Sequence, residues 1–152
     1  MLRLTQPTTD LLRVSASSTN AIQITVSYSE RTATAYTGKT AILVKTTTAI
    51  QDILGPPASG SVYAVDHAMF YCAAANTLTP SLTVSGTAVP YGVFVLAAGD
   101  TLEYTHADGW RVKDSTGAIK FTMPGYLPLT GGTGSGVATF TAQPILSSLT
   151  AS

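Results

Sequence analysis

The sequence predicts an all-β protein built as an antiparallel sandwich or barrel. Apolar and polar residues alternate over many short segments, which is the period of a half-buried strand. Turn signals separate these segments at intervals of about 8–12 residues, a spacing typical of sandwiches and barrels. No stretch of helical length shows a 3.6-residue apolar repeat, so no helix is expected.

The clearest strand pattern is a meander of three strands between residues 95 and 120. Polar and apolar residues alternate in 101–105 and again in 110–113. Asp108-Gly109 supplies the positive φ that a tight hairpin turn needs, and residues 114–117 form a second turn. Trp110 lies on the middle strand, and we expect it to pack over one edge of the fold.

The other elements follow from the same patterns. Extended segments are expected at residues 2–5, 11–14, 20–29, 41–44, 61–75, 82–85 and 91–97, while residues 50–54 fit either a strand or one helical turn. Residues 55–60 contain two prolines and two glycines and must form a loop. We expect the long segment 61–75 to be bent or bulged near Asp66 and His67, and a turn to follow at residues 76–80.

The composition divides the chain into a sandwich domain at residues 1–123 and an arm at residues 124–152. Pro7 limits the first strand, so residues 1–9 or so are expected to be an edge strand or a docking arm. Residues 124–152 carry no charged side chain, and residues 137–141 alternate like a strand. Two interpretations remain: a loose end, or an arm that adds a strand to a neighbouring chain. On the second, the expected interface residues are Leu2, Leu4, Val137, Phe140, Ile145, Leu146 and Leu149.

Charge is scarce in this sequence. Only 11% of the residues are charged, against about 25% in an average soluble protein, and the formal net charge is zero. Neutrality argues against nucleic acid or an anionic membrane as partner. The shortage of charged residues favours a surface that is covered by copies of the chain or by a larger assembly. A neutral Thr- and Ser-rich surface would also explain this shortage. The start of the chain lacks the apolar core of a signal peptide, so synthesis in a cytoplasm is expected.

No catalytic, cofactor or metal motif is found. Cys72 is the only cysteine and lies in an apolar run, so we expect a buried thiol. His67 and His106 lack the spacing of metal ligands. The acidic residues near the meander sit at turns, where Asp is favoured for local hydrogen bonds; calcium binding there stays open. A sugar-binding face around Trp110 is the weaker interpretation of that residue. We therefore expect no enzyme and no cofactor.

Several phrases of the sequence resemble passages of small virion proteins of tailed bacteriophages. They lie at residues 17–20, 40–44, 96–104, 109–112 and 114–120. The resemblance covers about residues 10–120 and rests on strand–turn–strand phrases, so it carries no functional residue across. It implies a jelly-roll-like or related sandwich, often trimeric, that decorates capsids or attaches to tails and fibres.

The expected function is capsid decoration, in which the protein binds and stabilises the shell of the major capsid protein as a cement. Low charge and apolar chain ends favour this role, because cementing requires large dry interfaces. The alternative is a tail, baseplate or fibre-associated module that recognises a host glycan or another tail protein. Both imply a homo-oligomer, most simply a trimer, that is made in the host cytoplasm and located in the virion.

Overall fold

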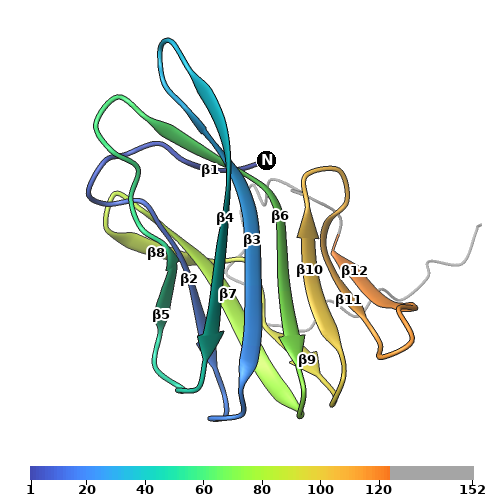
Figure 1. The fold of residues 1–152 in the computed structure, drawn as a ribbon. Coiled ribbons are helices and arrows are strands. Elements are labelled where there is room, and N and C mark those ends of the chain that lie inside the picture. Colours follow the sequence, from blue (N-terminus) through green and yellow to red (C-terminus); the bar gives the residue numbers. More distant parts are fainter. Residues whose placement is uncertain (124–152) are drawn as a thin grey trace, which may run out of the picture.

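The alternating residues pair into two antiparallel sheets in a computed structural model, which describes residues 1–123 of the 152-residue chain (Figure 1). The strands are β1 Leu2–Leu4, β2 Leu11–Ala16, β3 Ile22–Arg31, β4 Tyr36–Lys45, β5 Gln51–Leu54, β6 Val62–Cys72, β7 Asn76–Val84, β8 Thr87–Pro90, β9 Phe94–Leu96, β10 Thr101–Thr105, β11 Gly109–Lys113 and β12 Ile119–Met123. None of the described residues forms a helix able to cross a membrane.

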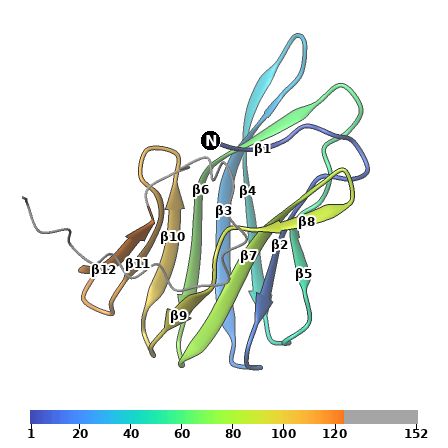
Figure 2. The same cartoon turned by 180° about the vertical axis from the view of Figure 1, so that it is seen from behind.

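The two sheets pack face to face as a β-sandwich, which confirms the predicted fold class. Sheet A has the order β12-β11-β10-β6-β3-β4, and β1 pairs with β6 beyond the end of β10. Sheet B has the order β5-β2-β7-β8, and β9 also pairs with β7. Sheet A lies in front in Figure 1, and sheet B lies in front in the reverse view of Figure 2. The chain crosses between the sheets repeatedly, as in jelly-roll-like sandwiches.

The core lies between the sheets and is formed by every second residue of the long strands. Its fully buried side chains include Phe70 and Ile24 from sheet A and Val14 and Leu78 from sheet B. Burying each such side chain contributes about 1.5–3 kcal/mol, so this layer supplies most of the stabilisation. The other faces of the sheets are therefore the surfaces on which a functional site can form.

The predicted meander is present as β10, β11 and β12. Trp110 faces Tyr104 across the β10–β11 pair and is 3% exposed. Its ring also lies against Phe70 of β6 and against Tyr91 and Phe94, with centroid distances of 5.5–5.9 Å. Trp110 thus joins both sheets next to the edge strand β12. This confirms a packing role and leaves no exposed indole face for a sugar.

The expected irregularity in the long strand β6 is also confirmed. Ser27 pairs with His67, but the next residue, Tyr28, pairs with Val65, so Asp66 is the extra residue of a β-bulge. The bulge keeps Val65 and Ala68 both buried, although they are three positions apart and would lie on opposite faces of a regular strand. It also turns Asp66 towards solvent.

The expected turn at residues 76–80 is wrong, because these residues belong to β7. Asn76 and Leu78 pair with β9, and residues 81–84 pair with β8. Pro80 falls between these two partners. On the side of β8 and β9, the carbonyl oxygen of Pro80 accepts a hydrogen bond from Tyr91 N at 2.9 Å. The N–H and C=O of one strand residue point to the same side, so the nitrogen of Pro80, which carries no hydrogen, faces the gap between β8 and β9. A proline is tolerated here because no ladder bond from its nitrogen is needed.

The N-terminal segment is a strand of sheet A. Leu2 and Leu4 of β1 face the core and are 3% and 0% exposed. Tyr104 Oη also accepts a hydrogen bond from Leu2 N at 2.9 Å. A partner chain would therefore reach these two leucines only if β1 left its place on β6.

Candidate interaction surface

The outer face of sheet A presents a small grid of apolar side chains around two polar ones. Cross-strand pairing places Val44, Gln23 and Tyr71 in one row and Ile42, Thr25 and Met69 in the next, on β4, β3 and β6 respectively. Directly opposite residues in adjacent strands project to the same face of a sheet. These six residues, called the apolar grid below, form one continuous surface.

The apolar grid is most exposed on β4. Ile42 is 78% exposed and Val44 is 56% exposed, whereas Met69 is 36% exposed. The run 41–44 is apolar throughout, so alternation sends Ala41 and Leu43 inward and leaves the other two residues in water. Two large aliphatic side chains held on the outer face of a strand mark a candidate protein-binding surface.

β4 is also an edge strand over its whole length. It pairs with β3 through all ten of its residues, and no described strand pairs with its other side. The backbone N–H and C=O groups on that side are open to another chain. Long edge strands with apolar side chains are sites of strand addition, so the edge extends the apolar grid as a binding surface.

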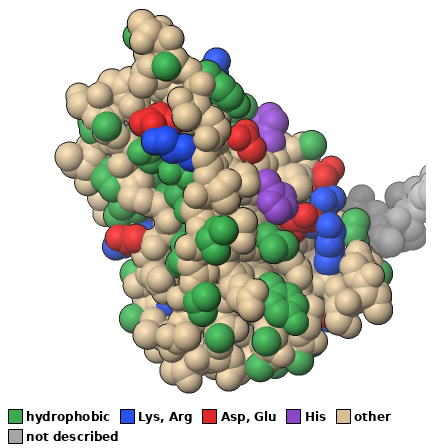
Figure 3. All heavy atoms as spheres, in the orientation of Figure 1, with side chains coloured by type: hydrophobic (Ala, Val, Ile, Leu, Met, Phe, Trp, Pro, Cys, Tyr) green, Lys and Arg blue, Asp and Glu red, His purple; other side chains and the backbone are tan. Residues whose placement is uncertain are grey.

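Charged residues gather on the other half of the same face. Figure 3 shows the outer face of sheet A with hydrophobic side chains over its lower centre and the two histidines and several charged groups towards β10 and β11. The register places Met69 of the apolar grid beside Glu103 of β10, which in turn faces Arg111 of β11. An apolar centre with a polar border is the arrangement of many protein interfaces.

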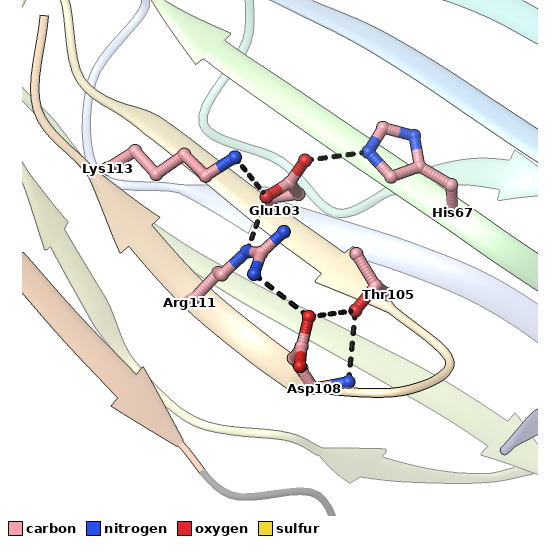
Figure 4. A network of polar contacts seen from close by, with 6 residues as sticks. All are labelled: His67, Glu103, Thr105, Asp108, Arg111 and Lys113. Atoms are coloured by element: carbon pink, nitrogen blue, oxygen red, sulfur yellow. Dashed lines mark hydrogen bonds and ion pairs between the residues drawn. The ribbon is translucent and has the colours of Figure 1, made fainter. Parts of the chain in front are cut away.

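Glu103 is the centre of this charged cluster (Figure 4). Its carboxylate accepts from Lys113 Nζ at 2.7 Å and from Arg111 Nε at 2.5 Å, and it lies 2.9 Å from His67 Nε2. Arg111 also reaches Asp108 at 2.9 Å. Burial alone would raise the pKa of Glu103, but the hydrogen bonds from Lys113, His67 and Arg111 outweigh it and hold that pKa at about 2.

The cluster has the features of a structural network. Each charged side chain of the cluster has a partner within it. Arg111 and Lys113 both contact the carboxylate of Glu103, which stays ionised at neutral pH. A general acid or base needs a pKa near the working pH, and Glu103 is far from that range. Among residues 1–123, no three His, Cys, Asp or Glu side chains come together as a metal site.

The remaining candidates from the sequence take separate places. Cys72 is fully buried, and burial raises the pKa of its thiol to about 11, so it is no nucleophile. His106 lies in the β10–β11 turn, where its backbone N–H donates a hydrogen bond to the backbone carbonyl of Asp66 at 3.2 Å. Leu2 and Leu4 are in the core, as described above. The interface residues predicted in the arm, Val137, Phe140, Ile145, Leu146 and Leu149, lie outside the described residues.

The most exposed residues of the apolar grid were not among the sequence predictions. The sequence pattern predicts an extended segment at residues 41–44 without indicating which of its residues face solvent. The signal was present nevertheless: a strand in a two-layer sandwich buries one face only, so such a run must expose every second residue.

Comparison of the chain with protein-family models, with curated proteins and with solved structures finds no match. The surfaces just described and the composition of the chain are therefore the observations that bear on its function.

Replacing Glu103 with glutamine is expected to cost about 1–3 kcal/mol of unfolding free energy at neutral pH, because charge-assisted hydrogen bonds are lost. The folded-state pKa lies below the ordinary value of 4.5, so the carboxylate stabilises the fold above that pH and ceases to do so as the pH falls towards 2. Urea unfolding of both proteins at pH 7 and pH 2 should show the difference shrinking in acid. An equal difference at both pH values would contradict this account.

Proposed function

We propose that the protein is a structural assembly component that binds other protein chains through the apolar grid and the adjoining edge of β4. The observation that carries the proposal is the exposure of Ile42 and Val44 on an edge strand whose outer side pairs with no described strand. The low charge of the whole chain supports it, because a surface with few charges loses little solvation when another protein covers it.

The grid alone is smaller than a stable interface. A specific interface buries about 800 Å² on each partner, which is more than a few aliphatic side chains supply. Contacts through the β4 edge and the surrounding polar residues must therefore add to it. The arm at residues 124–152, with its uncharged sequence, is the second element that we propose takes part in assembly.

The setting that we propose is the virion of a tailed bacteriophage, with the protein as a capsid decoration protein that binds the major capsid protein. The sequence resemblance and the charge deficit support this setting. The alternative is a tail, baseplate or fibre-associated module. Of its two forms, binding to another tail protein would use the same apolar grid, whereas glycan binding would need a site other than the buried ring of Trp110.

Imaging of the virion that contains this chain tests the setting. The proposal predicts density for the sandwich on the capsid shell, with the outer face of sheet A against a capsid subunit or another copy. Density at the tail would favour the alternative. Absence of the chain from purified virions by mass spectrometry would refute both.

Deletion of residues 125–152 is expected to leave the sandwich folded and to weaken assembly. The core cluster of the sandwich is built from side chains of residues 2–112, so the melting transition of the sandwich should persist. Light scattering and particle-binding assays compare the shortened and full chains. If the shortened chain assembles as tightly as the full one, the arm has no part in assembly and the sandwich surface alone carries it.

A further inference from the structure

A shallow hollow lies on sheet A at the end away from the apolar grid. It has a volume of about 340 Å³ and is lined by Arg3, Arg31, Thr32, Ala33, Gly60, Val62 and Ala64. These residues, called the arginine hollow below, come from β1, the end of β3, the β3–β4 turn, the loop before β6, and β6 itself. In Figure 1 they belong to the upper end of the sheet, near β1 and the β3–β4 hairpin.

The sheet register explains why the surface is hollow there. Ala64 of β6 faces Arg3 on one side and Ser29 on the other, and Ser29 in turn faces Gly38 of β4. Cross-strand partners project to the same face, so this row offers only small side chains between β1 and β4. Ala64 lines the hollow and is 6% exposed, and Ser29 beside it is 2% exposed.

The same register brings the two arginines to one face. Arg3 pairs with Ala64 and Arg31 pairs with Val62, two residues away on the same strand, so both side chains project on the side of the hollow. Because β1 and β3 lie on either side of β6, the Cα atoms of Arg3 and Arg31 are two strand spacings apart across the sheet. They are also two residues apart along the strand direction, which gives a separation of about 12 Å. At that separation both side chains are long enough to reach one small ligand placed in the hollow between them.

Arg3 and Arg31 are also exceptional among the cations of the chain. The other exposed ones have a carboxylate partner: Arg13, Lys39, Arg111, Lys113 and Lys120. Within residues 1–123 neither Arg3 nor Arg31 forms an ion pair, and no acidic side chain lines the hollow. Arg3 Nε contacts only Met1 Sδ, which is a weak acceptor, and the Arg31 guanidinium lies over the Tyr36 ring at 5.8 Å.

We propose that the arginine hollow binds a single oxyanion group, a carboxylate or a phosphate, on a ligand about the size of a monosaccharide. The guanidinium fork matches both anions through paired hydrogen bonds, and two forks around one cavity add their attraction. The volume lies at the lower end of the range for small-molecule sites, about 300–1,000 Å³. Tyr36 on β4 contacts the Arg31 guanidinium but is not part of the lining of the hollow. This site is separate from the apolar grid and does not depend on the assembly function.

The test uses the full chain and three matched probes: glucose, glucuronate and glucose 6-phosphate. The sequence has four arginines, so their Nε–Hε signals can be followed individually by NMR in low salt. One or both acidic sugars should shift the Arg3 and Arg31 signals to saturation, and glucose should not. The tighter of the two acidic probes identifies carboxylate or phosphate as the preferred group.

Variants decide whether the hollow itself binds. Arg3→Ala and Arg31→Ala should each weaken the affinity at least tenfold, and Arg31→Lys should weaken it as well, because the charge remains but the fork is lost. Arg13→Ala, which removes an arginine paired with Asp52 on sheet B, should leave it unchanged. Absence of saturable shifts with both anions, equal shifts with glucose, or an equal loss in Arg13→Ala would overturn the proposal.

Discussion

Replacing Trp110 with alanine is expected to destabilise the protein by about 3–5 kcal/mol, the range for removing a buried tryptophan. The ring is 3% exposed and contacts aromatic residues of both sheets, so the cavity left behind cannot close by a local shift. Domains of this size are stable by only about 5–15 kcal/mol, so the loss is a large part of the total. Urea unfolding followed by circular dichroism measures it.

Phenylalanine at position 110 provides the control. No described group accepts a hydrogen bond from Trp110 Nε1, so this replacement loses ring volume but no polar contact. The loss of unfolding free energy in Trp110→Phe should be well below the loss in Trp110→Ala. If Trp110→Ala unfolds at the same urea concentration as the natural chain, the ring does not join the two sheets as described.

Replacing Asp10 with alanine is expected to cost about 2–4 kcal/mol, since it leaves several backbone donors without a partner. Its carboxylate accepts from Thr5 N at 2.8 Å, Gln6 N at 3.0 Å and Ser85 N at 3.3 Å. Burial raises the pKa of Asp10, but these bonds reverse the effect and leave it lowered. Asp10 thus connects the β1–β2 loop to the β7–β8 turn through hydrogen bonds. Urea unfolding measures the loss of unfolding free energy in Asp10→Ala.

Asp114 offers a matched comparison, because its carboxylate also accepts backbone hydrogen bonds, from Thr116 and Ala118. Those bonds lie within one exposed turn and join no distant segments. Asp114→Ala should therefore cost clearly less than Asp10→Ala. Equal effects would mean that the link between Asp10 and Ser85 adds nothing to stability.

Local features of the fold were predictable from the sequence. The meander follows from alternation around Asp108 and Gly109, and the bulge at Asp66 follows from a polar pair inside an apolar strand. Each of these signals lies within a few residues of the structure it determines. The strand through Pro80 was missed because the tolerance of that proline depends on β8 and β9, which meet β7 only in the folded sheet.

The candidate surfaces depended on pairing between distant segments. Arg3 and Arg31 are far apart in the chain and line the same hollow only because β1 and β3 both pair with β6. The buried Lys45 shows the opposite case. Lys45 alternates with Ala41 and Leu43 along β4 and therefore lies on its inner face. There its ammonium group donates hydrogen bonds to Thr47 and Ala49. The alternation that places Lys45 on this face is visible in the sequence alone.

The mass of the protein in solution tests the central claim most directly, because self-assembly through the apolar grid should be visible without any other protein. Light scattering at tens of micromolar is expected to give a multiple of the 15.7 kDa chain mass, three times for the expected trimer. Ile42→Lys should reduce it to a single chain, because a charge would be buried at the centre of the interface. Thr87→Lys, on β8 of sheet B and outside both the apolar grid and the β4 edge, should not. A natural chain that remains at 15.7 kDa, or an Ile42→Lys variant that assembles fully, would contradict self-assembly through this surface.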